Sequence, residues 1–282
     1  MTHVSTHADE EIRRLLSRLD DLCDRAGRGE SAVSRFLTPR EARYASRHLS
    51  ARMRAGTACL FGGYADAERV RAVILPDYVE GMTDPDALAS DPITALSAAG
   101  LEDVAALVRE SANPILIQGS GYRELSHRDY LGSVLGLSLE RDAIGDILVK
   151  DAHSAYLITG APMAEFLVAN LTKVATDTVK VSYPPEGTLL SSARRLAPIT
   201  DTVASERLDC VVAALCSLSR DKAQTAIRTG LCELNYEPVE ECDVTVDPPA
   251  VISVRGYGKF AVHSFDGATR KGRIRLSAGK YL

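Results

Sequence analysis

Three polar side chains recur at helical spacing in "SRDKAQTAIRTG", residues 219–230. Arg220, Gln224 and Arg228 stand at i, i+4 and i+8, so a helix places them in one stripe. Guanidinium groups match the geometry of phosphate oxygens, and such a stripe suits a nucleic-acid backbone. The alternative is a well-capped surface helix whose basic stripe is only solvated. Neither arginine lies on the apolar side, so we expect their removal to weaken RNA binding and to leave the fold intact.

Neighbouring segments must hold this stripe in place. Ser219 is a typical N-cap and Gly230 a typical residue after a helix end. A second helix is predicted just upstream, in "SERLDCVVAALC". Downstream, Arg255 and Lys259 flank the turn "RGYGK", where glycine lets a phosphate approach the backbone.

These segments together resemble a known RNA-binding domain. Over about 80 residues, 203–282, the chain is similar to the domain named after ribosomal small-subunit protein four. The positions that match its pattern are Arg207, Leu208, Asp209, Ser219, Arg220, Ala223, Ile227, Gly230 and Asn235. The residues that we expect to contact RNA are Arg207, Ser219, Arg220, Lys222, Gln224, Arg228, Asn235, Arg255, Tyr257 and Lys259. Residues 231–250 hold six acidic residues and no basic one, so we expect this edge to face away from RNA.

The rest of the chain predicts an α+β, multidomain protein. "PILIQ", "SHRDYLGSVLGL", "GDILVK", "SAYLIT", "APMAEFLVANLTKV" and "DTVKVSY" alternate as βαββαβ, the ferredoxin-like (RRM-like) arrangement. Before them, helical periodicity and the start signal Thr38-Pro39 precede two short strands, "TACLF" and "RAVIL". We therefore predict a helical/α+β N-terminal domain over residues 1–80, an RRM-like middle domain with its connector over 81–183, a linker over 184–202 and a C-terminal S-four-type (αL) domain over 203–282.

The middle domain has few of the aromatic residues that stack on bases in an RRM. Its strands offer only Tyr156 and Tyr183, so we expect it to bind by shape, or to pack, rather than to read single strands. His127 and Arg128, which open a predicted helix, are possible secondary RNA contacts. The triplet His-Arg-Asp also occurs in kinase catalytic loops, but Val134 stands where those require Asn.

A second resemblance covers almost the whole chain. "FLTPREARYA", "FGGYADAERVRAVILPDY", "LSHRDYLGSVLGLSLERDAIGDI" and "NLTKVATDTVKV" are similar to the YlmH family of bacterial RNA-binding proteins. That resemblance implies an association with the large ribosomal subunit and a role in quality control of stalled nascent chains still attached to tRNA. It also implies possible links to cell division or, in photosynthetic relatives, to photosystem function.

Composition limits how such a protein meets RNA. The chain has 282 residues and a formal net charge of −5, which argues against coating nucleic acid over its whole surface. Its last 28 residues carry seven Lys or Arg and one acidic residue, so they form either a local docking surface or a solvated basic tail. The six cysteines form no C-x-x-C pair, and we expect no metal and no cofactor. No apolar span or signal peptide is evident, so we expect a cytoplasmic, ribosome-associated protein that is monomeric when free.

Two function classes remain open. The first is a non-enzymatic factor that docks on rRNA or tRNA. The second is an RNA-modifying enzyme of the pseudouridine-synthase type, which often carries the same small domain. Such an enzyme needs a catalytic Asp in a Gly-Arg-Leu-Asp setting, whereas Arg207-Leu208-Asp209 lacks the Gly and belongs to the small domain. We therefore favour the binding factor.

Overall fold

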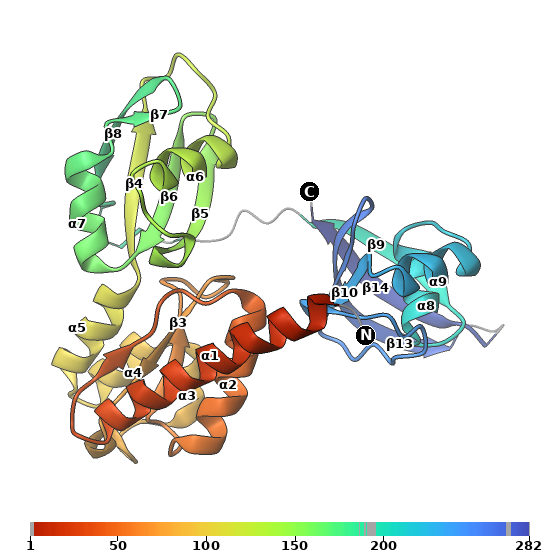
Figure 1. Ribbon diagram of the computed structural model, residues 1–282, viewed down its shortest axis with the longest axis horizontal. Coiled ribbons are helices and arrows are strands. Elements are labelled where there is room, and N and C mark those ends of the chain that lie inside the picture. The colour runs from red at the N-terminus through yellow and green to blue at the C-terminus, as the bar shows by residue number, and fades with distance from the viewer. Residues whose placement is uncertain (1–2, 186, 189, 191–195, 269–271, 282) are drawn as a thin grey trace. The chain divides into compact units, whose positions relative to one another are not determined.

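The computed structural model describes residues 3–185, 187–188, 190, 196–268 and 272–281. Its contacts divide the chain into two compact units, Met1–Ala193 and Arg194–Leu282 (Figure 1). Helices and three separate sheets are interspersed along the chain, which confirms the α+β, multidomain class. The domain boundary expected near residue 80 stays a prediction, because both sides of it belong to the first unit.

The first unit opens with helices packed on a small antiparallel sheet of order β1-β3-β2. Their apolar sides share one core with the middle strand. The elements are α1 (His3–Ala26), β1 (Ala32–Val33), α2 (Pro39–Arg52), β2 (Ala58–Phe61) and β3 (Arg71–Ile74). Helix α2 starts where the sequence predicts, because Thr38 and Glu41 form a capping box in which each side chain accepts from the other's backbone N–H.

Short helices make up the connector that precedes the middle domain. They are η1 (Asp77–Val79), α3 (Pro85–Ser90), α4 (Pro92–Ala98) and α5 (Glu102–Ser111). Asp84 and Asp91 cap α3 and α4, and a proline follows each cap. Proline suits this position because a first-turn N–H has no partner inside the helix. Their buried leucines and valines pack with Cys59 and Val73 of the small sheet.

The middle domain is a five-stranded antiparallel sheet of order β5-β6-β4-β8-β7. Its elements are β4 (Asn113–Gly119), α6 (His127–Leu135), η2 (Arg141–Ala143), β5 (Ile144–Asp151), β6 (Ser154–Thr159), α7 (Ala161–Asn170), β7 (Lys173–Val174) and β8 (Asp177–Ser182). Helices α6 and α7 share one core with alternate residues of the strands, such as Ile115 and Ile117. Apart from the short β7, this is the predicted ferredoxin-like βαββαβ order.

The other face of this sheet is partly covered by the N-terminal residues of the same unit. Phe36 and Ile158 are fully buried in one cluster. A Cβ at Gly145 would lie 2.8 Å from a ring carbon of Phe36, so the strand needs glycine there. Asp146 accepts a 2.8 Å hydrogen bond from the Tyr64 hydroxyl. This end of the sheet therefore packs against protein.

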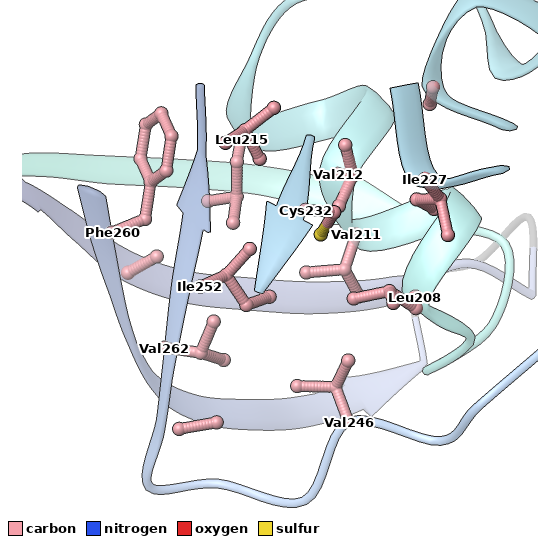
Figure 2. Packing of buried hydrophobic residues seen from close by; sticks show 14 of the residues in the cluster. Leu208, Val211, Val212, Leu215, Ile227, Cys232, Val246, Ile252, Phe260 and Val262 are labelled. Carbon is pink, nitrogen blue, oxygen red and sulfur yellow. The ribbon is translucent and has the colours of Figure 1, made fainter. Parts of the chain in front are cut away.

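The second unit is a six-stranded antiparallel sheet, order β11-β10-β12-β13-β14-β9, with two helices. Its elements are β9 (Leu196–Val203), α8 (Leu208–Leu215), α9 (Arg220–Arg228), β10 (Cys232–Leu234), β11 (Glu237–Pro238), β12 (Ala250–Val254), β13 (Gly258–Ala268) and β14 (Ile274–Tyr281). Figure 2 shows Leu208, Val211 and Val212 of α8 in one core with strand residues such as Ile252 and Val262. The helix pair predicted from the sequence is therefore fixed on the sheet by its apolar side.

The linker predicted over residues 184–202 is wrong at its C-terminal end. Residues from Leu196 onward form β9, which pairs along its length with β14. Pro198 favoured a linker, but β9 is an edge strand, and an edge strand tolerates proline because its outward N–H needs no partner. Residues 186, 189 and 191–195 of this segment lie outside the described residues.

Candidate nucleic-acid interface

The predicted basic stripe on α9 is built around a buried carboxylate. Asp209, in the first turn of α8, is 0% exposed. Its oxygens accept hydrogen bonds from Arg207 Nε at 3.2 Å, Arg220 Nε at 3.0 Å and Gln224 Nε2 at 2.8 Å. Burial alone would raise the pKa of Asp209. The bonds from Arg207, Gln224 and Arg220 outweigh it and hold the pKa well below its usual range. We call these four side chains the Asp209 cluster.

Two residues of the stripe have a structural role in this cluster. Arg220 and Gln224 direct donors at Asp209 and so join α9 to the start of α8. The Arg220 side chain is still 54% exposed, so only part of its donor fork faces solvent. Arg228, at the end of the stripe, is exposed and makes no hydrogen bond or ion pair with a described residue. Sequence spacing predicted that these three residues share one side of α9, but it gave no sign that Asp209 is the partner of Arg220 and Gln224.

The first turn of α9 adds a second cation. Ser219 caps the helix, as the sequence predicts, and its hydroxyl accepts from the Lys222 N–H. The Lys222 side chain is exposed and has no partner among the described residues. Gly230 follows the helix end at φ +70°, a conformation that favours glycine. Lys222 and Arg228 are thus the two α9 cations whose donors are fully available to a ligand.

The "RGYGK" turn lies next to the end of α9. It joins β12 to β13, and Gly256 and Gly258 have φ of +87° and +131°. A pocket of about 160 Å³ is lined by Gly230, Arg255 and Lys259 together with residues of β10 and β12. The structure therefore brings the turn and the C-terminal end of α9 together, as an interface for one backbone requires.

Aromatic rings surround the lysine of this turn. Lys259 Nζ lies 5.0 Å from the ring centroids of both Tyr236 and Tyr281, a cation–π geometry that fixes the ammonium. Tyr257 at the tip of the turn is 40% exposed. Tyr236 and Tyr281 were not among the predicted site residues, because their proximity to Lys259 depends on strand pairing.

Asn235 has a structural position in this unit. It adopts φ +53°, and its side-chain oxygen accepts a 2.9 Å hydrogen bond from the Val251 N–H. Its backbone N–H donates to the Val251 carbonyl at 2.6 Å. Asn tolerates this left-handed conformation better than most residues, so its place in the motif has a clear reason in turn geometry.

The possible secondary contacts lie in the first unit. His127 and Arg128 form the first turn of α6, where Ser126 and Asp129 make a capping box. Burial and the nearby Arg141 lower the pKa of His127, so its ring is mostly neutral at neutral pH. Arg128 is exposed and has no partner among the described residues. These two residues belong to the first unit, whereas α9 belongs to the second.

The described residues also bear on metal binding, cysteine chemistry and membrane spanning. The described ranges hold no cluster of His, Cys, Asp and Glu suited to a metal ion. All six cysteines are unpaired thiols, and burial raises the pKa of Cys59 and Cys232 to about 12. In the part of the chain that the structure describes, no helix is both long and apolar enough to cross a membrane. Arg270 and Lys271 of the basic tail lie outside the described residues.

Comparison with known proteins gives matches to a family model, to a curated protein and to solved structures. A family model described as a putative RNA-binding domain in YlmH matches residues 117–186, which run from β4 past β8. Ribosome-associated protein quality control protein P2 of Bacillus subtilis (strain 168) is 31% identical over 216 residues, 77% of this chain and 75% of that protein. Cell division protein ylmH from Streptococcus pneumoniae, a solved structure, has 14% identity and a TM-score of 0.42 over 66% of this chain and 93% of that one. That structural likeness is too weak to carry an argument.

Proposed function

The chain belongs to the YlmH family, and from this premise we propose that it is an RNA-binding protein that docks on the large ribosomal subunit. The observation that carries the proposal is the 31% identity to a ribosome-associated quality control protein over 77% of this chain. The docking site would be structured RNA, either rRNA or tRNA. In the cell this corresponds to a cytoplasmic, ribosome-associated protein.

The process that this docking would serve is the quality control of stalled peptidyl-tRNA. The name of the Bacillus subtilis relative supports that role. A candidate RNA surface on the second unit supports it physically. Lys222 and Arg228 of α9 are exposed cations, and Gly230, just after the helix, lines a pocket with Arg255 and Lys259 of the "RGYGK" turn. The contacts that we propose to RNA phosphates come from these two residues, Arg255 and the exposed part of Arg220.

We propose binding without catalysis. In the second unit the side chains of the Asp209 cluster contact one another, because Arg207, Arg220 and Gln224 all donate hydrogen bonds to Asp209. An Asp with no solvent contact cannot attack a base, so this aspartate is not the counterpart of a pseudouridine synthase nucleophile.

Sedimentation of a cell lysate through a sucrose gradient tests the location. The chain should co-sediment with large ribosomal subunits at low salt and move to the top of the gradient as salt rises, because phosphate contacts weaken with salt. A chain that stays at the top even at low salt would contradict the proposal. Incubating the purified protein with rRNA and tRNA tests the chemistry, and a new modified nucleoside in the digested RNA would contradict a purely binding role.

A further inference from the structure

Outside the surface on α9, arginines gather around one pocket of the first unit. The pocket has a volume of about 470 Å³. This lies within the roughly 300–1,000 Å³ typical of small-ligand sites. Its described lining includes six arginines and four carboxylates: Arg14, Arg18, Arg35, Arg40, Arg69, Arg141, Glu11, Glu41, Glu140 and Asp142. The lining comes from α1, the start of α2, the segment before β3 and η2, so four separate parts of the chain meet there.

Two of these arginines are held by backbone carbonyls instead of carboxylates. Arg141 Nη1 donates to the carbonyls of Ile144 and Gly145 at 3.0 and 2.9 Å. Arg69 donates from Nε and Nη2 to the carbonyls of Ile144, Phe36 and Arg141 at 3.2 to 3.3 Å. Burial lowers the pKa of both guanidinium groups, that of Arg141 to about 10. The neighbouring Arg69 lowers the pKa of Arg141 further, whereas the carboxylate of Asp146 acts in the opposite direction on both arginines. Two partly buried positive charges thus lie close together, and Asp146 offsets the cost of burial only in part, because both pKa values stay lowered.

Two carboxylates of the pocket are hydrogen-bonded or paired elsewhere. Glu41 accepts from the Thr38 N–H at 2.8 Å and pairs with Arg35, so it is engaged in capping α2. Asp142 lies 3.4 Å from Arg35 Nη1 and pairs with the same guanidinium. Within the described residues, neither of them bonds to Arg69 or Arg141.

Several guanidinium donors at the pocket have no acceptor among the described residues. They are Nε and Nη2 of Arg141, Nη1 of Arg69, the buried Nε of Arg35 and the whole exposed fork of Arg18. Guanidinium forks bind phosphate oxygens through paired, charge-assisted hydrogen bonds. A phosphate group would both accept these bonds and neutralise the adjacent charges of Arg69 and Arg141.

We propose that this arginine pocket binds a phosphate group of an RNA backbone, as a second RNA contact in the first unit. The inference rests on the proposed function, which supplies RNA as the phosphate source. A free phosphate or diphosphate offers the same oxygens, and the experiment must separate the two sources.

The test compares full-length variants in binding to purified large ribosomal subunits. Arg18→Ala removes an exposed pocket donor with no partner in the described chain, so its fold should be unaffected. Arg141→Gln removes a charge from the pocket floor. Arg13→Ala is the matched control, because Arg13 lies on the same helix, is exposed and does not line the pocket. Circular dichroism checks folding, and Arg18→Ala alone decides the outcome if Arg141→Gln does not fold.

We expect the pocket variants to bind large subunits about tenfold more weakly at low salt, as the loss of a charge-assisted hydrogen bond predicts. The slope of log affinity against log salt should flatten by about one, and Arg13→Ala should match the wild type. Unchanged affinity and slope in the folded Arg18→Ala variant would overturn the inference. The proposed function would survive that result, whereas failure of the wild type to bind large subunits would overturn both.

Calorimetry with inorganic phosphate and with pyrophosphate separates the sources. Weak or absent binding of these ions, together with loss of subunit affinity in the variants, supports an RNA phosphate as the ligand. Tight pyrophosphate binding that Arg18→Ala abolishes, without any change in subunit affinity, would overturn it and identify a site for a free anion.

Discussion

Asp209 keeps a negative charge with no access to solvent, and three donors make this possible. If one donor is removed, part of the carboxylate is left buried and unsatisfied. We expect Arg220→Ala to lower the free energy of unfolding by about 1–3 kcal/mol, the usual cost of an unsatisfied buried group. Urea denaturation measures this change. Arg228→Ala is the control and should stay within about 0.5 kcal/mol, because its side chain is exposed and unpartnered.

This expectation corrects the one drawn from the sequence, that both arginines could be removed without harm to the fold. The helical period showed correctly that Arg220 lies off the apolar side of α9. It could not show a partner eleven residues earlier on another helix. Equal stability of the two variants would mean that Arg220, too, is only a surface residue.

The same carboxylate makes the stability of the protein depend on acid. The pKa of Asp209 is lowered on folding, so its contribution is fully present above its unfolded value of about 4 and is lost as pH falls through the folded value. Unfolding in urea at pH 7, 4 and 3 should show the wild type losing more stability on acidification than Asp209→Asn. A variant that loses as much as the wild type would exclude Asp209 as a source of this dependence.

At the scale of the elements, capping signals in the sequence were reliable. Thr38 and Ser219 cap the helices that they were expected to start, and Ser126 caps the helix predicted to open at His127. Ser126→Ala should cost about 1 kcal/mol, because its hydroxyl accepts from the Asp129 N–H at the start of α6. Chemical denaturation checks this value. Ser17→Ala, inside α1, is the control and should leave stability unchanged or slightly higher, since alanine favours a helix interior.

Strand β9 shows where local sequence signals fail. The segment over residues 184–202 is predicted to be a linker because it carries proline and serine, yet residues 196–203 pair with β14 through their backbone. The arginine pocket could not be predicted from the sequence for a similar reason. Arg18, Arg69 and Arg141 are scattered over more than 120 positions and meet only through packing of the first unit. Strand pairing and packing between distant segments cannot be predicted from the spacing of residues within one element.

At the scale of the whole molecule, two compact units have separate cores. A cavity in one core should therefore loosen that unit and spare the other. Ile252→Ala, in the second unit, should cost about 2–5 kcal/mol there. Hydrogen exchange followed by mass spectrometry should show faster exchange in β12 and its neighbours and no change in β4 or β6. Ile117→Ala should give the reverse pattern, and a rise in both units from either variant would contradict independent cores.

The central claim is that the exposed cations of α9, together with the "RGYGK" turn, dock the protein on RNA of the large ribosomal subunit. The most direct test measures the affinity of purified large and small subunits for the wild type and for Lys222→Ala/Arg228→Ala at several salt concentrations. We expect tighter binding to large subunits, and a double variant that remains folded, binds more weakly and has a salt slope flatter by about one to two. Equal affinity for both subunits, or a folded double variant with wild-type affinity and slope, would contradict the account.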